Sequence, residues 1–172
     1  MFDLLGEHEV DWERVEVFQV DERVAPDRDP DRNLTLLQRS LPDEAAGSIR
    51  PMPVTDDDLD AAAARYAAQL PEALDLIHLG LGPDGHTASL VPGDPVLEVV
   101  DRAVAVTGQY QGRRRMTLTY PALAAARLIL WLVTGDEKRE ALAKLRAGDA
   151  SIPAARVKAR NAVVLCDAAA AG

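Results

Sequence analysis

The chain has 172 residues, of which 48% are apolar and 27% are charged, so it predicts one globular domain and excludes a disordered protein. The formal charge of −9 disfavours nucleic acid and anionic membrane surfaces as partners. One cysteine rules out an internal disulfide or a cysteine-based zinc cluster, and no apolar run approaches the ~20 residues of a membrane helix, so we expect a cytoplasmic protein.

Five short apolar runs are the predicted strands. Runs of this length, rich in β-branched and aliphatic residues, are typical of strands. The fourth run is apolar throughout, which predicts a strand covered on both faces, as in parallel sheets. The runs lie at about residues 15–20, 74–79, 103–106, 128–133 and 162–166.

Helical patterns occupy the stretches between these runs. The sequence after Thr55 is acidic and then apolar at helical spacing, which predicts a helix that Pro71 ends. Asp136 is the predicted cap of a second helix, Tyr120 and Pro121 begin a third, and residues 168–171 begin a fourth. The alternation of strands and helices predicts an α/β domain with a mostly parallel sheet.

The first candidate site follows the first predicted strand. Asp21, Glu22 and Arg23 come directly after residues 15–20, and a Pro- and Asp-rich loop at residues 25–32 leads on to Asn33. Ligands of parallel sheets bind beyond the carboxyl ends of the strands, and a turn-rich loop can hold charges over a pocket. The alternative is that these charges only mark where a buried strand meets water.

The second candidate site follows the second predicted strand, in the segment Gly-Leu-Gly-Pro-Asp-Gly-His-Thr-Ala-Ser-Leu at residues 80–90. Glycines such as Gly82 and Gly85 let backbone N–H groups approach a ligand closely. His86, expected at the beginning of a short helix, is a candidate general base that Asp84 can orient. Dinucleotide binding is the weaker alternative, because the glycine spacing leads into no long helix.

Two basic residues suggest a small anionic ligand. Arg115 ends the Arg triplet that follows residues 103–106, and Lys138 lies in the first turn of a predicted helix, where a bound anion would offset its charge. The alternative for each is a solvated surface residue. For Arg113 and Arg114 we favour that alternative.

Other reactive residues have plainer interpretations. We expect His78 to be a core histidine, His8 to be solvated and Cys166 to be a small buried hydrophobe. The histidines are not paired at metal-ligand spacing, so no metal site is expected. Ser89 has no glycine elbow around it, which disfavours a serine nucleophile.

Taken together, these segments resemble the 6-phosphogluconolactonase family, within the wider superfamily of glucosamine-6-phosphate isomerases and lactonases. The resemblance is most specific in Gly82-x-Asp84-Gly85-His86-Thr87-Ala88-Ser89-Leu90. It implies a three-layer α/β/α Rossmann-like domain that hydrolyses 6-phosphoglucono-1,5-lactone in the oxidative pentose phosphate pathway. It also implies that no metal or organic cofactor is needed. The segments are residues 12–33, 80–92, 115–119, 135–138 and 152–154, followed by Asp167.

The resemblance implies a catalytic role for four residues. His86 would take a proton from the water that attacks the lactone carbonyl, and Asp84 would position His86 or a sugar hydroxyl. Arg23 would stabilise the developing negative charge, with Asp21 holding Arg23 in place.

Five further residues would bind the substrate. Arg115 and Lys138 match the family's phosphate-binding positions, as a bidentate fork and a point charge. Gly82 and Gly85 would offer backbone N–H groups, and Asn33 would complete the site. The active form would be a monomer or a weak homodimer.

Departures from the family pattern leave alternatives open. Val91 stands where the family's isomerases have a glutamate that takes part in ring opening, which favours the lactonase over the isomerase. Family members carry an additional N-terminal portion with a phosphate loop, just before the helix that residues 1–6 resemble. The single domain at residues 1–172 is therefore expected to be incomplete at its N-terminus. The remaining alternative is a non-catalytic domain that binds a sugar phosphate weakly or associates through an uncovered sheet edge.

Overall fold

A computed structural model describes residues 8–172, so the helix expected around residues 1–6 lies outside the described residues. Strands and helices alternate along most of the chain, which confirms the α/β class. The elements are β1 (Val17–Phe18), β2 (Asp21–Arg23), α2 (Asn33–Ser40), β3 (Ile49–Arg50), α3 (Leu59–Ala67), β4 (Leu76–Leu79), β5 (Val104–Val106), β6 (Arg115–Leu118), α4 (Tyr120–Ala125), β7 (Leu128–Val133), α5 (Arg139–Ala147), β8 (Ala162–Cys166) and α6 (Ala168–Ala171). Short 3-10 turns lie at Trp12–Arg14, Asp43–Ser48, Pro95–Glu98, Asp136–Lys138 and Ala154–Arg156.

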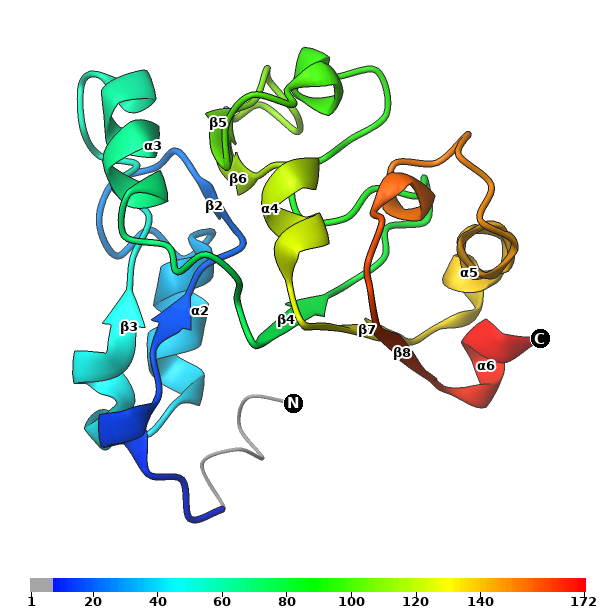
Figure 1. The fold of residues 1–172 in the computed structure, drawn as a ribbon, viewed down its shortest axis with the longest axis horizontal. Coiled ribbons are helices and arrows are strands. Elements are labelled where there is room, and N and C mark those ends of the chain that lie inside the picture. Colours follow the sequence, from blue (N-terminus) through cyan, green and yellow to red (C-terminus); the bar gives the residue numbers. More distant parts are fainter. Residues whose placement is uncertain (1–7) are drawn as a thin grey trace.

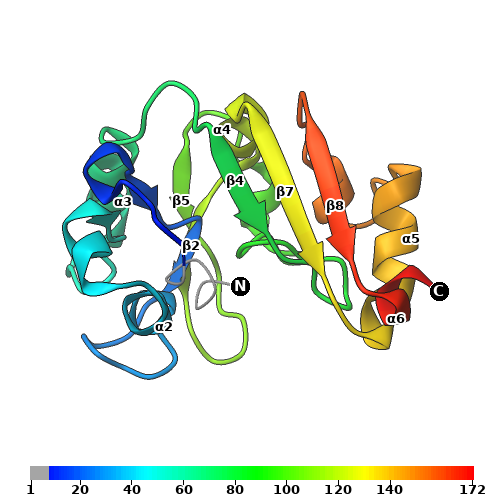
Figure 2. The ribbon, with the colours of Figure 1, turned by 90° about the horizontal axis from the view of Figure 1, so that it is seen from below.

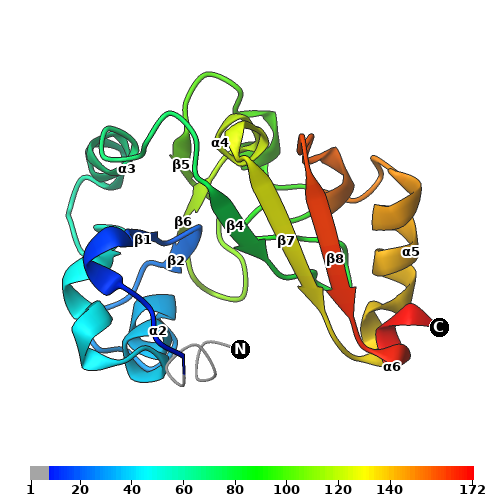
Figure 3. The same cartoon turned by 60° about the horizontal axis from the view of Figure 1, so that its bottom comes forward.

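The predicted parallel sheet is formed by three strands in the order β4-β7-β8, which lie side by side and point the same way (Figure 2). One face of this sheet packs against helices. Ile129 of β7 lies in the same buried cluster as Leu123 of α4 and Leu142 of α5. Figure 3 shows α5 and α6 beyond β8, at the edge of the sheet.

The opposite face of this sheet differs from the prediction. In β7 buried and half-buried residues alternate, and Leu76, Val163 and Leu165 on the neighbouring strands are 53%, 44% and 51% exposed. The prediction that the fourth run is covered on both faces is therefore wrong for the residues that the structure describes. Unbroken apolarity in a strand shows that both faces suit burial, but it does not show what covers them.

The first part of the chain forms two smaller sheets. Strands β1 and β3 form a parallel pair, and β2, β6 and β5 form an antiparallel sheet in that order. In Figure 1, α2, α3 and β1–β3 lie on one side of the molecule and α5, α6 and β8 on the other, with β4 and α4 between them.

The predicted strand at residues 15–20 is wrong in its bounds. Only Val17–Phe18 is strand, and Asp21–Arg23, expected as the loop beyond it, is the strand β2. The reason is pairing with β6, in which Asp21 is opposite Thr117 and Arg23 is opposite Arg115. A strand of three charged residues carries no apolar pattern, so its partner decides its structure.

The predicted helices are present, but α3 ends at Ala67 rather than at Pro71, and their caps differ in part from the prediction. Asp58 caps α3, because its carboxylate accepts a hydrogen bond of 2.9 Å from the N–H of Ala61. Asp136 makes no side-chain cap, because residues 136–138 form a 3-10 turn before α5. Helix α5 ends at Gly148, which has a φ of 67°. Helix α2 was not predicted.

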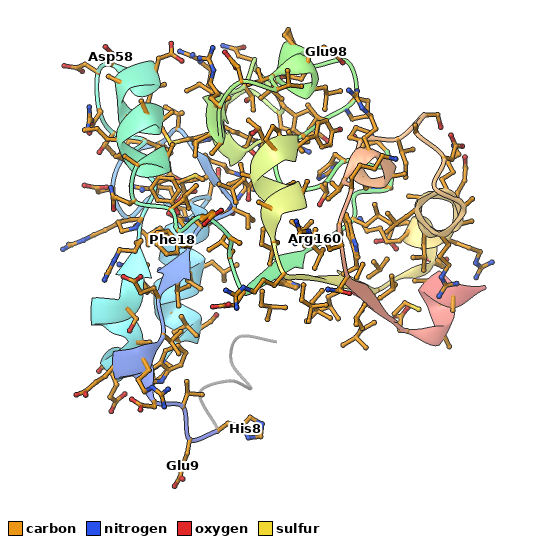
Figure 4. The ribbon with its side chains drawn as sticks, in the orientation of Figure 1. His8, Glu9, Phe18, Asp58, Glu98 and Arg160 are labelled. Carbon is orange, nitrogen blue, oxygen red and sulfur yellow. The ribbon has the colours of Figure 1, made fainter. Side chains whose placement is uncertain are left out.

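Strand β1 packs against α3. The rings of Phe18 and Tyr66 meet edge to face, with centroids 6.2 Å apart. In Figure 4, His8 and Glu9 project away from the body of the molecule. Among residues 8–172, every helix is too short or too polar to span a bilayer.

Candidate active site

A cavity of about 840 Å³ extends from the segment around β1 and β2 to β4 and the loop that follows β4. Its lining includes residues from both candidate sites and from both predicted anion-binding positions. Because these segments are far apart in the sequence, their convergence is a property of the fold. The predicted site residues that line the cavity are Asp21, Arg23, Asn33, Gly82, His86, Arg115 and Lys138.

The loop at residues 80–90 folds back on itself. The N–H of Gly82 donates to the His86 carbonyl over 2.8 Å, and the N–H of Gly85 donates to the Gly82 carbonyl over 2.9 Å. The short helix expected at His86 is therefore wrong, because these hydrogen bonds close turns instead. Both N–H groups are engaged within the loop, so the two glycines shape the site mainly through their missing side chains.

Gly82 and Gly85 each allow a close approach that a side chain would prevent. A Cβ atom at Gly82 would overlap Nδ1 of His86 and would lie 2.6 Å from Oδ1 of Asp84. Gly85 has a φ of +82°, and a Cβ atom there would overlap the side chain of Ile152. A side chain at Gly82 would therefore displace His86 and Asp84, and one at Gly85 would strain the backbone and displace Ile152.

Asp84 does not line the cavity but forms hydrogen bonds with His86, which does. Oδ1 of Asp84 lies 2.6 Å from Nδ1 of His86 and accepts a further hydrogen bond of 3.1 Å from its backbone N–H. Burial acts to raise the pKa of Asp84, but these hydrogen bonds outweigh it and hold the pKa below its usual value. An ionised Asp84 favours the proton on Nδ1, which leaves the lone pair of Nε2 free to accept a proton.

Asp21 holds Arg23 through an intermediate residue. Asp21 accepts hydrogen bonds from the Ser89 hydroxyl (2.6 Å) and from the side-chain amide of Asn33 (3.0 Å). The amide oxygen of Asn33 in turn accepts from Nη1 of Arg23 (3.0 Å), which also donates to the Asp31 carbonyl (2.6 Å). Burial raises the pKa of Asp21 despite the hydrogen bond from Ser89 and the nearby Arg115 and Arg23.

Glu22, predicted only as part of a charged cluster, is a structural part of the site. Its fully buried carboxylate accepts hydrogen bonds from the N–H groups of Asn33 (2.8 Å) and Leu34 (2.9 Å) at the beginning of α2. It also accepts from the Gln19 amide (3.0 Å) and from Nε of Arg32 (3.4 Å). Its position between Asp21 and Arg23 was the only signal, since strand alternation turns it to the opposite face.

Arg115 is suited to an anion. Its side chain is buried and lines the cavity, with Nη2 donating to Oε1 of Gln111 over 3.0 Å. Its Nε has no hydrogen-bond partner among the described residues. Burial, and then the neighbouring Arg23, lower the pKa of Arg115. Because the guanidinium borders the cavity, its N–H groups on that side can donate to a ligand oxygen.

Lys138 supplies a second positive charge to the lining. Its side chain is 20% exposed, and its Nζ lies 3.8 Å from the carboxylate of Glu137. This separation is long for an ion pair, so the ammonium group remains available to a ligand.

Arg113 differs from the prediction. It is not simply solvated, because its Nη2 lies 3.2 Å from a carboxylate oxygen of both Asp29 and Asp31. The reason is that the fold brings residues 25–32 beside the loop between β5 and β6, which sequence spacing does not reveal. Arg114 is exposed, as predicted.

The remaining reactive residues lie outside this arrangement or at its edge. His8 is exposed, as expected, whereas His78 is half-buried in β4, where burial lowers its pKa. Cys166 is half-buried rather than buried, and Arg146 donates to its sulfur over 3.2 Å. Among residues 8–172, no three His, Cys, Asp or Glu side chains are grouped so that they could hold a metal ion.

Comparison with protein families gives one match over most of the chain. Residues 1–166 match the model described as glucosamine-6-phosphate isomerases/6-phosphogluconolactonase. A 6-phosphogluconolactonase of Synechocystis sp. is 36% identical over 163 residues, which are 87% of this chain and 68% of that protein. One of Streptomyces coelicolor is also 36% identical, over 94% of this chain and 71% of the relative.

Comparison with solved structures gives the same picture of the fold. The 6-phosphogluconolactonase of Thermotoga maritima is 27% identical, with a TM-score of 0.85 over 96% of this chain and 78% of that one. A monomeric glucosamine-6-phosphate deaminase, at 21% identity and a TM-score of 0.79, shares the fold.

Proposed function

Because the chain belongs to the glucosamine-6-phosphate isomerase/6-phosphogluconolactonase family, we propose that it hydrolyses 6-phosphoglucono-1,5-lactone to 6-phosphogluconate. The observation that carries this proposal is the hydrogen bond of 2.6 Å between Asp84 and His86, at a cavity that is also lined by Arg23 and Arg115. A positioned base beside several cations suits the hydrolysis of an anionic ester.

His86 performs the proton transfers in this mechanism. Its Nε2 accepts a proton as a water molecule attacks the lactone carbonyl, and Asp84 stabilises the imidazolium that forms. When the tetrahedral intermediate collapses, the C–O bond of the ring breaks and His86 returns the proton to the ring oxygen. Arg23, held by Asn33 and by the Asp31 carbonyl, stabilises the oxyanion.

Arg115 and Lys138 bind the phosphate of the substrate. The guanidinium of Arg115, which lines the cavity, donates to a charged oxygen of the phosphate, and Lys138 adds a point charge from the turn before α5. These positive groups create a local anion site on a chain whose formal charge is −9. The product would enter the oxidative pentose phosphate pathway, and we place the reaction in the cytoplasm.

A comparison of two activities tests this proposal. The chain is assayed for lactone hydrolysis, coupled to 6-phosphogluconate dehydrogenase and corrected for the spontaneous rate, and for conversion of glucosamine 6-phosphate. We expect hydrolysis alone, because Val91 is a buried apolar residue where the isomerases carry a glutamate. Conversion of glucosamine 6-phosphate would support the isomerase instead. Hydrolysis at the spontaneous rate would support the non-catalytic alternative.

A further inference from the structure

The loop between β5 and β6 forms a tight hairpin beside the cavity. Tyr110 and Arg113 exchange backbone hydrogen bonds of 2.9 and 3.2 Å, and the two residues between them, Gln111 and Gly112, have φ values of 52° and 78°. Two consecutive residues with positive φ are typical of a type I′ turn, which fixes the direction of its flanking residues. Tyr110 therefore occupies a defined position at the beginning of the turn.

Tyr110 contacts both the Asp84–His86 pair and the anion-binding residue Arg115. Its hydroxyl lies 3.4 Å from Oδ2 of Asp84, the carboxylate oxygen that His86 does not use. Its ring meets the imidazole of His86 edge to face, with centroids 5.8 Å apart. The guanidinium carbon of Arg115 lies 5.0 Å from the centroid of the same ring.

We propose that Tyr110 is a positioning residue, whose hydroxyl fixes the carboxylate that orients His86 and whose ring holds the guanidinium of Arg115. This inference rests on the proposed function of the same site. A phenol can donate to the second carboxylate oxygen, and the negative face of an aromatic ring attracts a guanidinium. Tyr110 therefore fixes the distance between the proton acceptor and the phosphate-binding group.

The electrostatic surroundings keep the phenol in the donor form. Burial, and then the charge of Asp84, raise the pKa of Tyr110, while Arg115 acts in the opposite direction. The charged or titratable groups that face this cluster are Asp84 and His86 from the loop after β4 and Arg115 from β6. Arg115 interacts in turn with Asp21 and Arg23 of β2.

The hairpin is held from its other side as well. Arg113 forms ion pairs of 3.2 Å with Asp29 and Asp31, and Gln111 accepts from Nη2 of Arg115. Tyr110 is thus presented by a loop whose two flanks are both attached to residues around the cavity. This arrangement gives the tyrosine a fixed place from which to act.

Two variants separate the contributions of the hydroxyl and the ring. Tyr110→Phe removes only the hydroxyl, so we expect kcat to fall about three- to tenfold with KM changed less than about twofold. Tyr110→Leu also removes the ring, so KM for the phosphorylated lactone rises about three- to thirtyfold. Unphosphorylated glucono-1,5-lactone makes no demand on Arg115. For its hydrolysis we therefore expect the fall in kcat without the rise in KM.

Tyr120→Leu is the matched control. The hydroxyl of Tyr120 donates to the Pro153 carbonyl over 3.1 Å, and the guanidinium carbon of Arg156 lies 5.0 Å from its ring centroid. The control therefore loses the same two types of contact, but its partners Pro153 and Arg156 do not line the cavity, whereas His86 and Arg115 beside Tyr110 do. We expect its KM to stay within about twofold of the wild-type value.

The binding of inorganic phosphate, measured by calorimetry, tests the inference without catalysis. We expect Tyr110→Leu to weaken phosphate binding about three- to thirtyfold, and Tyr110→Phe and Tyr120→Leu to leave it unchanged. Equal phosphate affinity in the wild type and Tyr110→Leu, or no phosphate binding by the wild type, would overturn the role of Tyr110. Wild-type hydrolysis at the spontaneous rate would instead overturn the proposed function. The phosphate affinities would still test the positioning role of Tyr110.

Discussion

Gly82 is the residue on which the geometry of the proposed base most directly depends. A methyl group at this position would overlap Nδ1 of His86 and would lie close to Asp84, whereas a Cβ atom at Gly80 would meet no atom within 4 Å. We therefore expect Gly82→Ala to lower kcat about 100-fold by displacing the pair, and Gly80→Ala to leave it within about twofold. Steady-state kinetics of the two variants checks this. Equal rates would show that the pair can move without loss.

Asp21 accepts hydrogen bonds that hold the site together, but its ionised form lowers the stability of the folded protein. Because burial raises its pKa in the folded state, its ionisation destabilises the fold above that pKa and has no effect below the unfolded value of 3.8, where both states are protonated. Asp21→Asn keeps partners for Ser89 and Asn33, so we expect it to be more stable than the wild type at pH 7. The difference should disappear near pH 3.

Urea unfolding of the wild type and Asp21→Asn at the two pH values measures this difference. A variant that is less stable than the wild type at pH 7 would show that the hydrogen bond from Ser89 and the charges of Arg23 and Arg115 outweigh the cost of burial. In that case folding would lower the pKa of Asp21 instead of raising it.

The two faces of the three-stranded parallel sheet β4-β7-β8 contribute differently to the free energy of unfolding. Ile129 is fully buried on the face that packs against α4 and α5, while Leu165 on the other face is 51% exposed. Removal of a buried isoleucine side chain leaves a cavity, so Ile129→Ala should lower the free energy of unfolding by about 2–5 kcal/mol. For Leu165→Ala we expect less than about 1 kcal/mol.

Denaturation in urea compares the two faces directly. Similar losses for Ile129→Ala and Leu165→Ala would mean that the face of Leu165 is covered when the protein is in solution. Repeating the measurement over a range of protein concentrations then shows whether a second copy of the chain provides that cover.

At the scale of the whole molecule, strands with strong apolar patterns and helices with clear boundaries were predictable. Leu128–Val133 and Ala162–Cys166 are strands over the expected residues, and α4 begins at Tyr120 as expected. Strands β2 and β6 were not, because they contain charged and polar residues and exist through their pairing with each other. Local sequence does not contain that information.

The site residues also divide into those that the sequence indicated and those that only the fold reveals. The resemblance to a family indicated Asp21, Arg23 and His86, and the fold brings all three to one cavity. Tyr110 was missed and the role of Glu22 was not predicted, because the importance of both lies in contacts with distant parts of the chain. Glu22 holds the beginning of α2, and Tyr110 reaches Asp84 across 26 positions of sequence.

Hydrolysis of 6-phosphoglucono-1,5-lactone by the wild type and by His86→Ala tests the central claim most directly. Since general base catalysis contributes about 10²–10⁴-fold, we expect the rate above the spontaneous reaction to fall by at least 100-fold in His86→Ala. His8→Ala, which changes an exposed histidine, should keep the wild-type rate. Wild-type hydrolysis that His86→Ala retains, or a wild type no faster than the spontaneous reaction, would contradict the account.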